Sequence, residues 1–525
     1  MSSSLNALAP PSRRLSRSSL GAICILGGLY FLTRLGSLSV LPVFLDEAVH
    51  IQWAERLYGE GRILRPAGSG RLLAVAAYGL ALPFEDRLRA ARCVAVLAGA
   101  VSLLLTVLLA HRLFGPRAAT VAGGLYVLSP FALVYDRLAL SDGFLSMSIV
   151  GLMLATWIVV QDPSRAGPRA GLAILIVLAV GSKVSALLFF LVVPWGLLTL
   201  TRDRPRVFRP LAGAFTIGLL GASPMLWLFV SNGAEVSAQH IVDPRAAGSV
   251  ILSTVLDMRD WAESYFSVPI LAFAAASAIL LRDGRALWLG GSVVLPFLLF
   301  GLFSQPWSAR YVLPTLPPLL ILVAGGIDAV AARLKPSLGR FTAFVLAALI
   351  SLPGVSFDRD LLLDPAGAPF PRDDRLQLVT GWPSGYGVRE LSARLKREAG
   401  PGPLTAFVDT GGTRTMPTSL ALLLARHPSV RLAEGDLGSA AFRALMTAEA
   451  QRGPTFAIIG PRPLDLDLFS LFEGVSLERL EVFQKPGGEW AGTLFRLRFP
   501  SAVDPSTRTD VLGSSPRVPG TDLHD

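Results

Sequence analysis

The chain has 525 residues, of which 52% are hydrophobic and 16% are charged, and its mean hydropathy is +0.54. Soluble domains carry about 25% charged residues, so this composition and the repeated apolar runs exclude an ordinary soluble domain and predict a polytopic membrane protein. The net charge of +10 does not indicate nucleic-acid binding, because the basic residues form short clusters between apolar runs, as expected of cytoplasmic loops.

The N-terminal apolar run is predicted to be a retained first span, not a cleaved signal peptide. A basic tail over 1–19 precedes it, the run extends over 20–42, and many further apolar runs follow. A helix over 46–58 and an apolar stretch over 71–84 come next. About 13 apolar positions are too few to cross a bilayer, so we expect this stretch to lie at the membrane surface.

The remaining apolar runs predict further spans, which bring the total to about 11. In chain order they cover 89–110, 118–134, 143–161, two shorter helices within 170–200 broken at 181–183, 211–230, 265–281, 286–303, 311–331 and 340–355. Every loop assigned to the cytoplasm is basic, which predicts a cytoplasmic N-terminus in a plasma (inner) membrane protein. An outer loop is expected over 231–262.

The composition changes after residue 355, where the transmembrane domain over 20–355 ends. We expect a linker over 356–384, a small extracytoplasmic α/β domain over 385–499 and a tail over 500–525 whose Pro, Ser and Gly content predicts disorder. The α/β prediction is based on alternating strand-like and helix-like runs. These runs lie at 404–410, 419–427, 455–463, 477–484 and 492–499.

Polar residues gather on the predicted outer face of the membrane domain. They are Asp46, Glu47, Arg137, Asp142, Lys183, His240, Asp243, Arg310 and Tyr311. Ionisable groups near a bilayer are costly, so their presence predicts a functional site. Cations would bind a phosphate-linked donor, and a carboxylate would remove a proton from an alcohol or amine acceptor.

Five segments in this order resemble those of the GT-C glycosyltransferases. The resemblance is to the bacterial, PMT-like branch (glycosyltransferase family 39-like) related to protein O-mannosyltransferases and lipid A aminoarabinose transferases. The segments are "FLDEAVHIQWAERL", "RLRAARCVAVLAGAVSLLLTVLLAHRLFG", "LSPFALVYDRLALSDGFLSM", "VGSKVSAL" and "RYVLPTLPPLLILVAGG". The similarity covers about residues 20–355. The stretch "RLQLVTGWPSGYGVREL" resembles a segment that follows the last span in some relatives.

The resemblance implies an α-helical GT-C fold and an integral-membrane enzyme that transfers a sugar with inversion. The donor would be a polyprenyl-phosphate-linked sugar, and the acceptor a lipid, glycan or protein outside the membrane. Asp46 is the expected general base, with Glu47 and Asp142 as further catalytic candidates. The expected donor-phosphate ligands are Arg137, Lys183, Arg310 and Tyr311, and the loop candidates are His240 and Asp243.

No cofactor follows from the sequence. The two cysteines, Cys24 and Cys93, lie in apolar runs, and no strong metal-ligand cluster is present. The sequence leaves open a divalent ion held by Asp46 and a group on an outer loop.

Each candidate also has a structural interpretation. Asp46 would be a helix N-cap, Glu47 would balance the helix dipole, and Arg137 with Asp142 would be an ion pair at a turn. Lys183 would snorkel, Arg310 would be an interfacial anchor with Trp307 and Tyr311, and His240 and Asp243 would belong to a solvated loop.

Two other functions fit parts of the pattern. A transporter or flippase of lipid-linked sugars would also need intramembrane charges, but it predicts internal repeats and broken helices in both halves, whereas the sequence shows one break and no repeat. A membrane-anchored scaffold for a partner protein would need only one span.

Overall fold

The computed structural model describes most of the chain. The described residues are 17–36, 38–238, 247–303, 308–400, 402–411, 415–460, 475–488 and 490–498. His240 and Asp243, the two predicted loop candidates, and the predicted tail over 500–525 lie outside the described residues.

The chain divides into two compact units. The first contains the described residues within 1–393, 414–426 and 484–489, and the second contains those within 394–413, 427–483 and 490–525. Residues 414–426 and 484–489, which the sequence places inside a continuous 385–499 domain, therefore belong to the helical unit.

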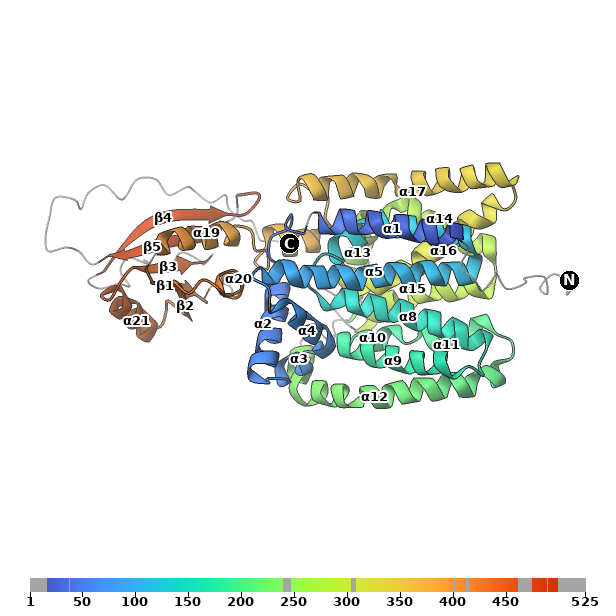
Figure 1. The fold of residues 1–525 in the computed structure, drawn as a ribbon, viewed down its shortest axis with the longest axis horizontal. Coiled ribbons are helices and arrows are strands. Elements are labelled where there is room, and N and C mark those ends of the chain that lie inside the picture. The colour runs from blue at the N-terminus through green and yellow to red at the C-terminus, as the bar shows by residue number, and fades with distance from the viewer. Residues whose placement is uncertain are drawn as a thin grey trace. The chain divides into compact units, whose positions relative to one another are not determined.

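The first unit is helical. Its first half contains α1 (Arg17–Leu35), α2 (Leu45–Glu60), α3 (Leu64–Gly68), α4 (Leu72–Tyr78), α5 (Arg87–Phe114), α6 (Pro116–Val127), α7 (Pro130–Tyr135), α8 (Ser141–Gln161) and α9 (Ala166–Ser182). Its second half contains α10 (Ala186–Phe189), α11 (Val192–Leu200), α12 (Arg204–Ala238), α13 (Ala247–Trp261), α14 (Ser267–Leu281), α15 (Gly284–Phe303), α16 (Leu316–Ala331), α17 (Pro336–Leu363) and α18 (Arg372–Arg375). Helices α5, α8, α9 and α12 pack in that order within the bundle (Figure 1).

Six helical segments in the described part of the chain are long and apolar enough to cross a membrane. They are Arg87–Phe114, Ser141–Gln161, Arg204–Asn232, Val255–Leu281, Ala309–Ala331 and Pro336–Leu363. Five shorter apolar helices accompany them, including Leu72–Ala81, which the sequence assigns to the membrane surface. The protein is thus a multi-pass membrane protein, and about 11 spans remains a prediction.

Proline and serine explain one difference from the predicted spans. The sequence predicts a single helix over 118–134, but α6 ends at Val127 and α7 begins at Pro130. Proline lacks an N–H and clashes with the preceding turn, so it begins a new helix more readily than it continues one. Ser129 caps the new helix by accepting a hydrogen bond from the Ala132 N–H.

The described residues of the predicted outer loop over 231–262 are helical. Helix α12 continues to Ala238, and α13 covers Ala247–Trp261. Neither 231–238 nor 247–261 contains proline, so no strong helix breaker opposes these helices. The predicted break near 181–183 is confirmed, because α9 ends at Ser182 and Lys183 has an extended backbone.

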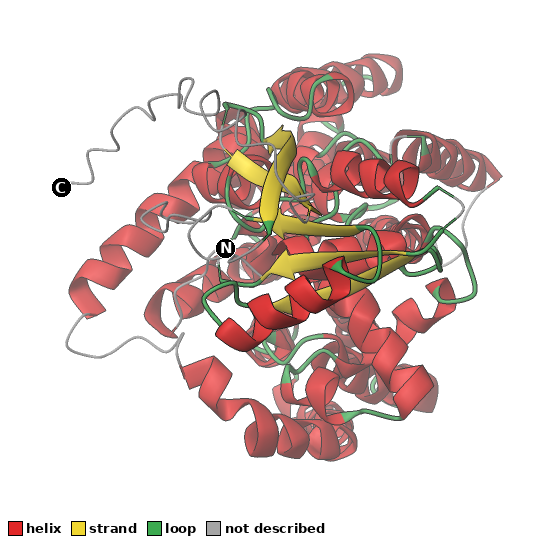
Figure 2. Cartoon of the chain, turned by 90° about the vertical axis from the view of Figure 1, so that its left-hand side faces the viewer, coloured by secondary structure: helices red, strands yellow, loops and turns green. Residues whose placement is uncertain are grey.

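The second unit is built on a five-stranded sheet. Its strands are β1 (Leu404–Asp409), β2 (Val430–Gly435), β3 (Thr455–Ile459), β4 (Ser476–Gln484) and β5 (Trp490–Arg498), in the order β2-β1-β3-β5-β4. Strand β1 pairs in parallel with β2 and β3, and β3 pairs antiparallel with β5. Figure 2 shows the strands in yellow.

Helices connect the parallel strands, as this pairing requires. In the chain, α20 (Thr415–Leu424) lies between β1 and β2, α21 (Ala440–Ala450) lies between β2 and β3, and α19 (Val388–Ala399) precedes β1. The small α/β domain predicted from the sequence is therefore present, although the sequence did not identify β2 or α21.

Candidate active site

Asp46 and Arg310 form an ion pair although they lie 264 residues apart. Arg310 Nη2 donates to Asp46 Oδ2 at 2.7 Å, and the side chains are 8% and 26% exposed for Arg310 and Asp46. The Arg310 guanidinium also lies 5.2 Å from the ring centroid of Phe44 and 5.6 Å from that of Tyr311. The carboxylate of Asp46 is therefore held in place while part of it stays accessible.

Asp46 is not the N-cap of α2. The helix begins at Leu45 and its N-cap is Phe44, so Asp46 is the second helical residue. Burial would raise the pKa of the Asp46 carboxyl, but the cations of Arg310 and Arg71 outweigh it and hold this pKa below its usual range. Asp46 is consequently ionised at neutral pH.

A second ion pair adjoins the first through Tyr311. Lys183 Nζ lies 2.6 Å from Asp142 Oδ1, and both side chains are buried. The same Lys183 Nζ is 3.9 Å from the centroid of the Tyr311 ring. The helix break after Ser182, the first turn of α8 and the segment Ala309–Thr315 thus converge at one place.

His50 and Arg71 belong to the same cluster, and the sequence analysis missed both. His50 Nδ1 lies 3.0 Å from the Ala139 carbonyl oxygen, and His50 Nε2 lies 3.1 Å from Arg71 Nη1. A carbonyl accepts and a guanidinium only donates, so the imidazole is neutral with its proton on Nδ1. Burial and the Arg71 cation lower the pKa of His50 to about 4. His50 lies four residues after Asp46, so their spacing on one helix face is the sequence signal that could have identified His50.

Glu47 has surroundings quite unlike those of Asp46. Its carboxylate is buried and accepts hydrogen bonds from the Phe44 N–H, the Ala139 N–H and two nitrogens of Arg92. Arg92 also donates to the carbonyl oxygens of Leu38, Leu41 and Pro42. With four donors on two oxygens, Glu47 fixes the loop that leads into α2, and a positioning role suits it better than contact with substrate.

A segment after α17 fixes both sides of the Asp46–Arg310 pair. At one end, Asp374 accepts from the hydroxyls of Ser308, Tyr135 and Tyr265 and from the Ala309 N–H. At the other end, the Pro383 carbonyl oxygen accepts from the Leu45 N–H at 3.1 Å, and Ser384 forms a β-bridge with Phe44.

This brace, residues 374–384, thus binds the residues next to Arg310 and the residues next to Asp46. It overlaps "RLQLVTGWPSGYGVREL", the stretch whose role the sequence left open. No sequence signal singled out Asp374, because its partners are distant in the chain.

Arg137 lies away from the cluster. Its Nε donates to the Leu133 carbonyl oxygen, and its electrostatic neighbours include Arg34, Asp136 and Asp358. The structure therefore does not bring Arg137 beside Asp142, its predicted ion-pair partner, since Asp142 pairs with Lys183.

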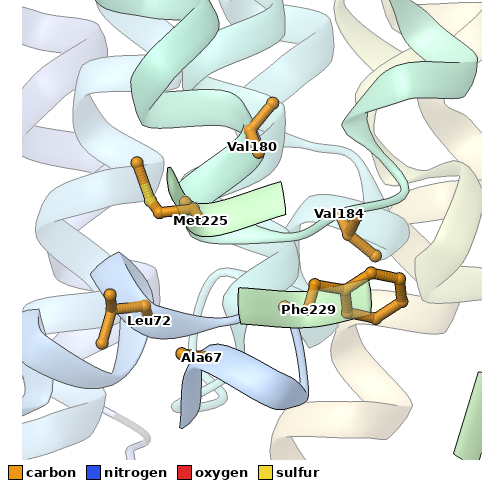
Figure 3. A pocket seen from close by; sticks show the side chains of 8 residues that line it. Ala67, Leu72, Val180, Val184, Met225 and Phe229 are labelled. Carbon is orange, nitrogen blue, oxygen red and sulfur yellow. The ribbon is translucent and has the colours of Figure 1, made fainter. Parts of the chain in front are cut away.

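Residues next to two of these cations in the chain line a small apolar pocket (Figure 3). It is lined by Ala67, Gly70, Leu72, Val180, Gly181, Val184, Met225 and Phe229. Arg71 lies between two of these residues in the chain, and Lys183 directly precedes Val184. The Val184 N–H donates to the Gly70 carbonyl oxygen and so ties the two segments together. In the described part of the chain, no three His, Cys, Asp or Glu side chains gather as a metal site would require.

Comparison with known proteins agrees with this architecture. Residues 73–228 match the family described as dolichyl-phosphate-mannose-protein mannosyltransferase. A search of curated protein sequences found no match.

Two solved proteins have a similar fold. ArnT from Cupriavidus metallidurans, bound to undecaprenyl phosphate, is 17% identical over 91% of this chain and 97% of its own, with a TM-score of 0.57. The archaeal oligosaccharyltransferase AglB from Archaeoglobus fulgidus, in complex with an inhibitory peptide and a dolichol-phosphate, is 12% identical over 84% of this chain and 69% of its own, with a TM-score of 0.51. At these identities the structural likeness establishes the fold alone. The chain thus has a fold similar to those of ArnT and AglB, and its residues 73–228 resemble the mannosyltransferase family.

Proposed function

We propose that the protein transfers a sugar from a polyprenyl-phosphate donor to an acceptor on the outer side of the membrane, with inversion at the anomeric carbon. The observation that carries this proposal is the partly exposed, ionised Asp46 carboxylate held by Arg310 beside Lys183. A base and phosphate-binding cations are the two requirements of such a reaction.

The charges around Asp46 suit an anionic donor. Arg71, Lys183 and Arg310 supply three positive charges, whereas Asp46 and Asp142 supply two negative ones and His50 is neutral. The cluster thus has an excess of one positive charge, which the donor phosphate would balance.

The proposed transfer takes one step. The acceptor hydroxyl or amine gives its proton to Asp46 as its oxygen or nitrogen attacks the anomeric carbon. The bond from that carbon to the phosphate oxygen breaks, and the electron pair leaves with the polyprenyl phosphate. Lys183 and Arg310 offset the charge that develops on the leaving phosphate.

Donor binding would also strengthen the base. In the absence of donor, Arg310 stabilises the ionised form of Asp46 and makes it a weak base. A phosphate that draws on the same guanidinium would weaken this stabilisation and raise the pKa of Asp46. Asp46 would then accept a proton more readily once the donor is in place.

The orientation of the chain in the membrane belongs to the same proposal. We place the N-terminus in the cytoplasm and residues 356–525 outside a plasma (inner) membrane, with about 11 spans, because the intervening cytoplasmic loops are basic. Asp46 would then lie where an acceptor arrives from outside and a lipid donor arrives within the outer leaflet.

Lipid analysis of a deletion strain tests the proposed function. Cells without this protein should accumulate a polyprenyl-phosphate sugar and lose that sugar from one glycan, lipid or protein. Purified protein in vesicles should then release polyprenyl phosphate from the accumulated lipid. A protein that only moved this lipid across the vesicle membrane, without releasing the sugar, would be a flippase and would contradict the proposal.

A further inference from the structure

A pocket lined by arginines lies at the C-terminal end of α2, where the chain turns into α3. Its lining residues are Trp53, Arg56, Arg62, Arg65 and Pro66. The proposed reaction uses none of them. Three guanidinium groups around one pocket form a strongly basic surface.

The positive charge of this pocket is only partly balanced. Arg62 Nε lies 2.6 Å from Glu60 Oε2, and both of these side chains are exposed. For Arg56 and Arg65, the described residues provide no carboxylate within ion-pairing distance. Like charges that face a common space repel one another, and a bound anion removes this cost. Guanidinium groups match phosphate particularly well, since they donate two parallel hydrogen bonds.

The surroundings of the pocket indicate that the anion is carried by a lipid. Tyr58, Ile63 and Leu64, which flank the arginines in the chain, are 61%, 41% and 56% exposed. Exposed apolar side chains next to arginines are typical of segments that lie in the headgroup region of a bilayer. A soluble anion would not require these apolar neighbours.

The pocket is separate from the Asp46 cluster but lies along the same helix. Asp46, His50 and Trp53 are spaced by four and three residues and therefore share one face of α2. The rings of His50 and Trp53 are 6.0 Å apart. Seven residues of helix separate Asp46 from Trp53 by about 10 Å along the axis, so both places can be occupied at the same time.

We propose that Arg56, Arg62 and Arg65 form a second lipid-phosphate site, distinct from the site of the donor phosphate. The phosphate belongs either to the lipid acceptor or to an anionic phospholipid of the bilayer. The proposal goes beyond the proposed function and holds whether or not Asp46 is the base, because it concerns binding without transfer.

Native mass spectrometry of the full chain in detergent tests this site. The probes are dioleoyl phosphatidic acid, which carries a phosphomonoester, phosphatidylglycerol, which carries a phosphodiester headgroup, and zwitterionic phosphatidylcholine. The test variant combines Arg56→Gln with Arg65→Gln. The control combines Arg206→Gln with Arg209→Gln, which removes the same charge from two exposed arginines of α12.

We expect anionic lipid to bind the wild-type protein more tightly than phosphatidylcholine does. The affinity of the protein for anionic lipid should fall at least about tenfold in the pocket variant, since two charged hydrogen-bond donors are lost. The same affinity should stay unchanged in the control variant. Preference for phosphatidic acid over phosphatidylglycerol would identify an acceptor-type phosphate, and equal affinity would identify a bilayer headgroup. Equal binding to wild type and pocket variant would overturn the proposal.

Two milder variants distinguish loss of the binding site from loss of the fold. Arg56→Lys with Arg65→Lys keeps the charge but loses the paired hydrogen bonds, so it should retain an intermediate affinity. Arg65→Gln alone changes one exposed side chain and should weaken binding less than the double variant. Loss of affinity in the glutamine variants together with full loss in the lysine variant would contradict a charge-based site.

Discussion

Glu47 and Arg92 form a buried ion pair at the start of the helix that carries Asp46. Arg92 Nε lies 2.8 Å from Glu47 Oε1, and Arg92 Nη2 lies 2.6 Å from Glu47 Oε2, with the side chains 0% and 2% exposed for Glu47 and Arg92. The neighbouring carboxylate of Asp46 is 26% exposed. Two adjacent acids thus have different surroundings, one closed off by donors and one open to a substrate.

Glu47→Gln should destabilise the protein. Removing one partner of a buried ion pair leaves the other charge uncompensated and costs about 3–5 kcal/mol. Thermal unfolding of the purified protein in detergent measures this loss. Glu55→Gln is the matched control, because the Glu55–Arg87 pair on the same helix is partly exposed and should contribute at most about 1 kcal/mol. Similar unfolding temperatures for both variants would contradict the structural role of Glu47.

Lys183 and Arg310 should bind the lipid phosphate. Undecaprenyl phosphate is the probe, and its affinity should fall at least about tenfold in Arg310→Ala and in the double variant Lys183→Gln with Asp142→Asn. The double variant avoids leaving a buried, unpaired carboxylate. Arg117→Ala, which breaks a partly exposed pair with Asp328, serves as the control. Unchanged affinity in both test variants would exclude these cations from the phosphate site.

The acid limb of the pH–rate profile for sugar transfer should move to higher pH when Arg71 is replaced. The Arg71 cation lowers the pKa of His50 to about 4 and helps hold the pKa of Asp46 below its usual range. Arg71→Gln removes a positive charge, which favours protonation of both groups, so both pKa values rise. The rate should therefore begin to fall at a higher pH in the variant than in the wild-type protein.

Release of polyprenyl phosphate between about pH 3 and 8, a range that brackets the ordinary pKa values of Asp and His, measures this shift. Arg206→Gln, which changes an exposed arginine of α12 outside the cluster, should leave the profile in place. An acid limb that moves to lower pH in Arg71→Gln would contradict the assignment of a neutral His50 beside an ionised Asp46.

Asp374→Asn should slow transfer more than it weakens the fold. An amide has one oxygen in place of two, so it cannot accept from Ser308 and Ala309 and also from the two tyrosines. The segment that leads into Arg310 would lose its anchor, and a displacement of about 1 Å in an active site can cost about 10²-fold in rate. Asp373→Asn, one residue away, is the control. Equal rates for the two variants would show that the brace does not position Arg310.

The local features of the fold were predictable because they depend on nearby residues. The break after Ser182 follows from "GSK" between two apolar runs, and strands β1 and β3 follow from short apolar runs bounded by Pro and Gly. The continuous helix predicted over 118–134 failed at Pro130. The described residues of the predicted outer loop over 231–262 are helical, since low hydrophobicity does not prevent a helix.

The site was only partly predictable, because its geometry depends on contacts between distant residues. The predicted topology assigns Asp46, Lys183 and Arg310 to one side of the membrane, but the pairing of Asp46 with Arg310 joins residues 264 positions apart. The anchoring of Ser308 by Asp374 joins residues 66 positions apart. No local pattern encodes either contact.

The rate of sugar transfer by Asp46→Asn tests the central claim most directly. The substitution keeps the size of the side chain and an oxygen that can accept from Arg310, so the fold and the binding of undecaprenyl phosphate should persist. It removes the proton acceptor, and loss of a general base costs about 10²–10⁴-fold in rate. Purified Asp46→Asn should therefore release polyprenyl phosphate at least about 100-fold more slowly than the wild-type protein and the Glu55→Gln control. A rate within about threefold of wild type, well outside that range, would show that Asp46 is not the base.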